Sequence, residues 1–218
     1  MKTVLCIDAG DFGGGSAESL YVHIGSLKEK YNFICIFSSR NRFSKKIEKL
    51  GVPVYYSLEN YFNIGYIEKN KLKAKLLNLL YKLTFRMKSL NLHNSLIFLF
   101  NKPFYELYEK IIKNESIDII HTNNQPNRDF LLIKIASTYN KRVVSHIRSS
   151  NTYGFSMAKI QYCNSHVNTF ITYSSFLKKI WAEKKLDNSK IQVISNVVEQ
   201  LSKKELCEAM MPLKEIYQ

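Results

Sequence analysis

Short apolar runs alternate with amphipathic stretches along this chain, and that rhythm constrains the fold more than any other feature. The apolar runs lie at residues 3–9, 33–37, 52–56, 117–121, 143–146, 169–173 and 192–194. Stretches with helical spacing of apolar residues follow at 16–30, 43–50, 128–139, 156–165 and 175–184. Strands that alternate with helices pair in parallel, because each helix returns the chain to the same end of the sheet. The sequence therefore predicts an α/β fold with a doubly wound parallel sheet of about seven strands.

Residues 61–114 break this rhythm and predict a helical insertion after the third strand, made of two or three helices. The insertion is strongly basic: residues 69–105 hold eight of the Lys and Arg residues and no acid, in a chain whose net charge is +14. A basic amphipathic helix next to an apolar run is typical of a surface that binds an anionic membrane. A solvated helix face is the alternative, whereas nucleic acid is not expected because no recognition motif is present. The predicted membrane-binding residues are Lys69, Lys71, Lys73, Lys75, Lys82, Arg86 and Lys88.

The length of 218 residues fits one domain at 1–199, and residues 200–218 predict a C-terminal helix or the start of a second domain. The opening apolar run is too short for a signal peptide, and no stretch is apolar enough for a spanning helix. The cysteines are scattered, which indicates reduced core thiols. We therefore expect a cytoplasmic protein.

Polar residues stand where the predicted strands end, and parallel strands bring such ends to one edge of the sheet. A glycine loop also precedes the first helix, where backbone N–H groups can approach a phosphate. The alternatives are a turn with positive φ for the glycines, a structural role for His121, and caps for Ser174 and Asn196. The candidate substrate-binding residues are Gly13, Gly14, Gly15, Ser16, His121, Asn123, Asn124, His146, Arg148, Ser174 and Asn196.

Other chemistries find less support in the sequence. The five histidines lack the spacing of metal ligands, and no serine or cysteine lies in a nucleophile motif. The glycine loop departs from the dinucleotide pattern G-x-G-x-x-G. An NADP-binding oxidoreductase, with Arg40 or Arg42 on the 2′-phosphate, is the weaker alternative.

The run Gly13-Gly14-Gly15-Ser16-Ala-Glu-Ser-Leu20, together with the strand ends at His121, His146, Ser174 and Asn196, resembles the N-terminal half of a family 4 glycosyltransferase. That family has two facing Rossmann-like domains, the GT-B fold. The resemblance implies transfer of a hexosyl group from a nucleotide sugar to a lipid-linked or polysaccharide acceptor. This domain would bind the acceptor and form one wall of the donor cleft, with no cofactor beyond the donor substrate. Many members carry a second His where this chain has Asn123.

The resemblance also implies that partners complete the protein. The family's nucleotide-binding domain has no counterpart in these residues, so we expect the chain to be inactive alone. It would be the N-terminal domain of a two-domain transferase at the inner face of the membrane. The alternative is a non-catalytic subunit that recruits a catalytic partner chain to the membrane.

Overall fold

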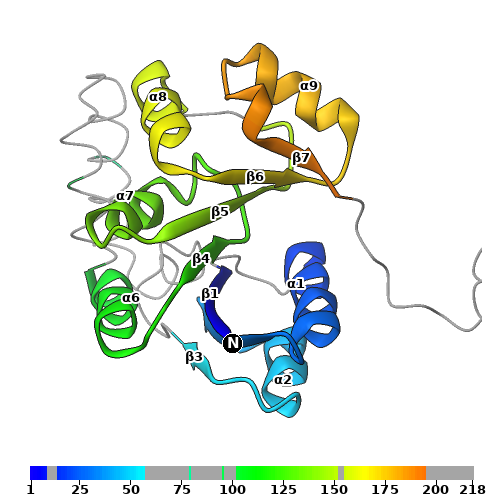
Figure 1. Ribbon diagram of the computed structural model, residues 1–218, viewed down its shortest axis with the longest axis vertical. Helices are drawn as coiled ribbons and strands as arrows, with labels where there is room; N and C mark the ends of the chain where they lie inside the picture. The colour runs from blue at the N-terminus through cyan, green and yellow to red at the C-terminus, as the bar shows by residue number, and fades with distance from the viewer. Residues whose placement is uncertain (9–13, 57–78, 80–94, 96–101, 152–154, 195–218) are drawn as a thin grey trace, which may run out of the picture.

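Seven parallel strands form one sheet in the computed structural model (Figure 1), which describes residues 1–8, 14–56, 79, 95, 102–151 and 155–194. Their order across the sheet is β3-β2-β1-β4-β5-β6-β7. The predicted α/β fold, with about seven parallel strands, is confirmed. The strands are β1 (Lys2–Asp8), β2 (Tyr31–Phe37), β3 (Val54–Tyr56), β4 (Ile119–Thr122), β5 (Arg142–Ile147), β6 (Thr169–Thr172) and β7 (Ile191–Val193).

Helices cover both faces of the sheet (Figure 1). One face carries α1 (Gly15–Leu27) and α2 (Arg42–Lys49), and the other carries α6 (Lys102–Asn114), α7 (Phe130–Thr138) and α8 (Met157–His166). Helix α9 (Ser175–Glu183) contributes its buried Trp181 to the same apolar core as α6, α7 and α8. A short 3₁₀ helix, η1 (Asn188–Lys190), leads into β7.

The two helical layers explain why the strands read as unbroken apolar runs. In β1, Val4 and Cys6 belong to the core beneath α1 and α2, whereas Leu5 and Ile7 belong to the core on the opposite face. A strand that is buried on both faces needs apolar residues at every position, not at alternate ones.

The chain reverses its direction of travel across the sheet beside β1. From β1 it proceeds outward to β2 and β3, and after the insertion it returns to β4, which pairs with the other edge of β1. Helices therefore leave β1 and β4 toward opposite faces. In such sheets the carboxyl ends of these two strands border a crevice where ligands bind.

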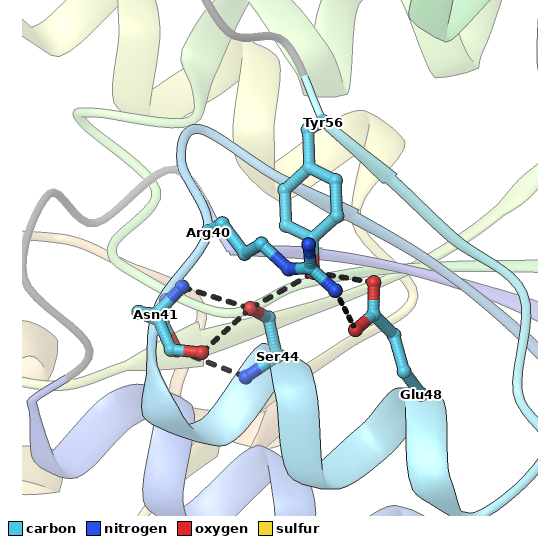
Figure 2. A network of polar contacts seen from close by, with 5 residues as sticks. All are labelled: Arg40, Asn41, Ser44, Glu48 and Tyr56. Carbon is cyan, nitrogen blue, oxygen red and sulfur yellow. Dashed lines mark hydrogen bonds and ion pairs between the residues drawn. The ribbon is translucent and has the colours of Figure 1, made fainter.

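Most predicted helix ends were correct to within a few residues, because local side chains fix them. The side chain of Asn41 accepts from the backbone of Ser44 at the start of α2, and the Ser44 hydroxyl accepts from Asn41 N–H (Figure 2). Gly51, which follows this helix, has φ +82°, a conformation that favours glycine. Ser174 caps α9 by accepting from the N–H of Leu177, which is the alternative role considered for this residue.

Only part of the predicted insertion at 61–114 can be assessed. Helix α6 begins at Lys102, in agreement with the predicted helix start at Asn101-Lys-Pro103, and the seven predicted membrane-binding residues lie outside the described residues. Within the part that is described, no helix combines the length and apolar character needed to cross a membrane. The cysteines that are described, Cys6, Cys35 and Cys163, are buried free thiols.

Candidate functional site

A polar cluster lies at the carboxyl ends of β1, β4 and β5, where the sheet topology predicts a ligand site. Its centre is Arg148, which follows β5. The guanidinium donates from Nε to the carbonyl of Asn123 at 3.3 Å and from Nη1 to Ser19 Oγ on α1 at 3.1 Å. It also donates from Nη2 to Asn123 Oδ1, and Nη2 lies 3.1 Å from Nδ1 of His146. The predicted residues Asn123, His146 and Arg148 therefore do come together.

Arg148 keeps its positive charge in this setting. Burial lowers its pKa to about 10, and the negative charge of Asp8 opposes that effect. A pKa of about 10 still leaves the guanidinium protonated at neutral pH. The cluster thus holds a fixed cation at the edge of the sheet.

Asn123 joins three elements through its side chain. Its Nδ2 donates to Asp8 Oδ2 at the end of β1 and to the carbonyl of Ser16 in α1, each at 2.9 Å. Its Oδ1 accepts from Arg148. Because the amide is fully buried and both of its ends are used, a sugar hydroxyl would have to replace one of these bonds.

Two imidazoles extend the cluster along the sheet. Nε2 of His121 lies 2.8 Å from Nδ1 of His146, and the ring centroids are 4.8 Å apart. Burial lowers the pKa of His146 well below its ordinary value, and the positive charges of His121, Arg148 and His23 act in the same direction. His146 is therefore neutral at physiological pH, when a ring nitrogen can either donate or accept.

Gly14 and Gly15 stand at the N-terminus of α1, beside this cluster. A Cβ atom added at either position would meet nothing within 4 Å, so internal packing does not require glycine. Gly14 has φ −78°, and Gly15 lies inside the helix, so the alternative of a turn with positive φ is wrong for these two residues. The N-cap residue Gly14 has no side chain with which to cap this helix start. The open space and the N–H groups at the helix N-terminus suit an anionic ligand.

A second layer of contacts supports the loop between β4 and α7. The buried carboxylate of Asp129 accepts from Asn124 N–H at 3.1 Å, and burial raises the pKa of Asp129 to about 7. Gln125 donates to Ser149 Oγ, and Trp181 donates to the Ser149 carbonyl at 2.9 Å. These bonds hold the loops after β4 and β5 together.

The remaining predicted residues divide into those with other contacts and those that are not described. Ser174 caps α9, and Ser16 offers its carbonyl to Asn123. Asn124 is buried, and within the described residues its Nδ2 has no hydrogen-bond partner. Gly13 and Asn196 lie outside the described residues.

Arg40 and Arg42, the sequence candidates for a 2′-phosphate, both contact side chains of the protein. Nη2 of Arg40 forms an ion pair with Glu48 at 3.0 Å, and the Tyr56 hydroxyl lies 2.9 Å from the other oxygen of the same carboxylate (Figure 2). The guanidinium of Arg42 lies 4.5 Å from the ring centroid of Phe43.

Sequence reasoning missed several members of the cluster. Asp8 carried a usable signal, because an acid that ends a buried apolar strand stands at the carboxyl edge of the sheet. Ser19 and His23 are four residues apart on α1, which places both on one helix face. Cys6 read as an ordinary core residue, and only the strand register brings it beside His121.

The fold and the polar edge place the chain among Rossmann-like α/β domains. Residues 65–200, more than half of the sequence, match the model of Glycosyltransferase Family 4. The chain belongs to this family, and the resemblance to its N-terminal domain is confirmed. No curated protein matches the sequence.

Several solved structures, two of them named as glycosyltransferases, share this fold. Anabaena Alr3699/HepE in complex with UDP and glucose matches with a TM-score of 0.61 and 11% identity, over 98% of this chain and 50% of that one. A glycosyltransferase of Rickettsia africae matches with 0.56 and 18%, over 98% and 49% of the two chains. The lipopolysaccharide outer core galactosyltransferase WaaB matches with 0.51 and 14%, over 93% and 47%. At these identities the likeness concerns the fold alone, and this chain spans about half the length of these structures.

Proposed function

We propose that this chain is the N-terminal domain of a glycosyltransferase that moves a hexosyl group from a nucleotide sugar to a lipid-linked or saccharide acceptor. In this proposal it binds the acceptor and forms one wall of the donor cleft. The observation that carries the proposal is the charged Arg148, which follows β5 and is held beside the N-terminus of α1 by bonds to Asn123 and Ser19. The complex of Anabaena HepE with UDP and glucose supports a nucleotide-sugar donor.

The chemistry of the cluster suits such a ligand. A departing nucleoside diphosphate gains negative charge in the transition state, and a fixed cation with helix N–H groups stabilises that charge without reorganisation. The neutral His146 offers hydrogen bonds to hydroxyl groups at the same edge of the sheet. Arg148 would act mainly through its charge, because its N–H groups already bond Asn123 and Ser19.

Substitution of Arg148 tests this proposal. Ligand-detected NMR would measure the affinity for UDP-glucose, UDP and glucose separately. Arg148→Gln should weaken UDP-glucose and UDP binding by about 10 to 100-fold, the contribution of one charge-assisted interaction. Arg148→Lys keeps the charge and should retain most of the affinity.

The matched control is Arg142→Gln, because Arg142 is exposed at the opposite end of the same strand. Circular dichroism verifies that each variant folds. Equal affinities of folded Arg148→Gln, Arg142→Gln and wild type would refute the proposed role of the cluster.

The basic segment that carries Lys69, Lys71, Lys73 and Lys75 remains a proposed membrane surface. Its test is co-sedimentation with vesicles, with and without anionic lipid, after all four lysines are changed to Glu. The control reverses four exposed lysines elsewhere, Lys28, Lys30, Lys45 and Lys49, for the same change in net charge. Loss of salt-sensitive binding in the first variant alone would support the proposal, whereas equal loss in both would indicate an unspecific charge effect.

A second candidate, a subunit that recruits a separate catalytic chain, is favoured by exposed apolar side chains near the same edge of the sheet. Tyr173, Phe176, Val193 and Ile194 are 40%, 70%, 42% and 40% exposed. Tyr173 and Ile194 directly follow the paired ends of β6 and β7. A separately encoded nucleotide-sugar-binding domain, which forms a complex with this chain that Phe176→Asp dissociates, would support this candidate. A second such domain on the same polypeptide would exclude it.

A further inference from the structure

We propose that Cys6 is a positioning residue of the polar cluster: its thiol and the His121 imidazole share one proton, which fixes His121 as hydrogen-bond donor to His146. Close contacts connect Cys6 to His121 and His121 to His146. Cys6 Sγ lies 3.8 Å from Nδ1 of His121, and Nε2 of His121 lies 2.8 Å from Nδ1 of His146. Strand pairing fixes the first contact, because Cys6 in β1 and His121 in β4 are register partners.

Arg148 determines which atom donates and which accepts in this series of hydrogen bonds. A guanidinium can only donate, so Nδ1 of His146, 3.1 Å from Nη2 of Arg148, must be an acceptor. The other close neighbour of that nitrogen, Nε2 of His121, must then carry a hydrogen. A neutral His121 with its hydrogen on Nε2 has a lone pair on Nδ1, which faces the thiol of Cys6.

The shared proton has two positions, and both preserve the bond to His146. With the proton on sulfur, the thiol donates to Nδ1 of His121. With the proton on Nδ1, the pair becomes a thiolate and an imidazolium, and the total charge is unchanged. Nε2 of His121 carries a hydrogen in either state and donates to His146.

The surroundings of Cys6 favour its ionised form despite complete burial. A hydrogen bond from the Cys35 thiol of β2 is the largest cause that lowers the pKa of Cys6, to about 6, and His121 contributes a further hydrogen bond and its charge. Burial raises the pKa of Cys35 itself, so Cys35 remains the thiol donor.

The pair is not arranged as a metal site. Among the described residues, no three His, Cys, Asp or Glu side chains could hold a metal ion together. The contact with Arg148 sets the tautomer of His146, with its lone pair on Nδ1 and its hydrogen on Nε2, and the Cys6–His121 pair keeps His121 as the second donor to that lone pair. Within the described residues, Nε2 has no hydrogen-bond partner. Its use as a donor to a ligand oxygen rests on the proposed function, whereas the position of the proton does not.

NMR of the ligand-free chain tests the inference directly. In protein labelled at the Cys β-carbons, the Cys6 signal, assigned by its absence in Cys6→Ala, should report thiolate formation with a midpoint near pH 6. His121→Gln retains a donor toward His146 but has no basic nitrogen that could take the proton of the thiol. It should raise the Cys6 midpoint by about one pH unit, a tenfold change in proton affinity.

The histidine ¹⁵N spectrum supplies the second readout. Cys6→Ala should shift the Nδ1 signal of His121, and Cys6→Ser, whose hydroxyl can donate but does not ionise at this pH, should restore it in part. Cys163→Ala is the matched control, because Cys163 is fully buried on the opposite face of the sheet.

Equal His121 spectra in Cys6→Ala and Cys163→Ala, or a Cys6 midpoint that His121→Gln leaves unchanged, would overturn the inference. Neither readout involves UDP-glucose. Failure here therefore leaves the proposed function untouched, and failure of the Arg148 binding series leaves the shared proton untouched.

Discussion

Replacement of Asp129 by Asn should change how the stability of this domain depends on pH. The Asp129 carboxylate is fully buried, immediately before α7. Burial raises its pKa to about 7, more than the hydrogen bonds from Asn124 and Thr122 lower it, and the charge of Asp8 raises it further. In the unfolded chain the same group titrates near pH 4.

The magnitude follows from this difference. Between about pH 4 and pH 7 the folded protein holds a proton that the unfolded chain has released, so the free energy of unfolding falls as the pH rises. Each pH unit within that range lowers the free energy of unfolding by about 1.4 kcal/mol. From pH 5 to pH 8, Asp129 should therefore remove about 3 kcal/mol of stability, because its effect ends near pH 7.

Urea denaturation at pH 5, 6, 7 and 8 measures this effect, with the fluorescence of Trp181 as the signal. Trp181 is the only tryptophan, and it is fully buried. The free energy of unfolding of Asp129→Asn minus that of wild type should increase by about 3 kcal/mol over this range. Because both proteins contain His23, His146 and Cys6, the contributions of these groups to the pH dependence cancel when the two free energies of unfolding are subtracted.

Asp187→Asn is the control, because Asp187 is a half-buried N-cap whose pKa is lowered, chiefly by hydrogen bonds from Ser189. The stabilising effect of Asp187 is complete above pH 4 and is lost only at lower pH. The difference in the free energy of unfolding between Asp187→Asn and wild type should therefore stay constant between pH 5 and pH 8. A difference between Asp129→Asn and wild type that stays constant with pH would refute the reasoning.

Four further substitutions test single backbone and side-chain features by thermal or urea unfolding. Ser174→Ala removes the cap of α9 and should destabilise the domain by about 1 kcal/mol, whereas no change would mean that α9 frays without consequence. Gly51→Ala places a side chain at φ +82° and should destabilise the domain by about 1 kcal/mol. Gly25→Ala lies inside α1, where the new side chain makes only an ordinary contact to Leu50, and should stabilise the domain by about 0.5 to 1 kcal/mol. A change in stability of the same sign in both variants would contradict the backbone argument. Tyr56→Phe removes the hydroxyl next to Ser44 and Glu48 and should destabilise by about 1 kcal/mol, and a neutral result would show that solvent replaces these bonds.

The sheet was predictable because its signals are local and repeated. Each strand lies in a short run of the sequence that is rich in apolar residues, and the helices that cover the sheet show a separate pattern, the helical spacing of apolar residues. The errors lie at the ends. The third strand was predicted from Val52 but begins at Val54, and Pro53 between them lacks an N–H group for the ladder. The helix predicted from Arg128 begins at Phe130, because Arg128 and Asp129 belong to a turn in which both N–H groups donate to the carbonyl of Gln125.

The candidate site was predictable as a set of strand ends, but its internal contacts were not. A parallel sheet requires His121, Asn123, His146 and Arg148 to meet at one edge, whatever their detailed geometry. Which side-chain atoms form hydrogen bonds with one another depends on the register of the paired strands and on the direction of each side chain. Asn123 illustrates the limit of sequence reasoning, because an amide expected to contact a sugar bonds Asp8, Ser16 and Arg148 within the protein.

Cys6 shows what register adds to a sequence. Its neighbours along the chain are Leu5 and Ile7, and nothing local separates it from them. Parallel pairing with β2 and β4 places Cys35 on one side and His121 on the other, although His121 is 115 residues away. In a sheet buried on both faces, a polar residue of a central strand gains most from a partner across a strand boundary, as Thr122 of β4 does by donating to Ser145 of β5 at 3.0 Å, because water is excluded. A thiol or imidazole inside such an apolar run therefore predicts a polar neighbour at the same height in the next strand, and here that rule leads from Cys6 through His121 to the edge of the candidate site.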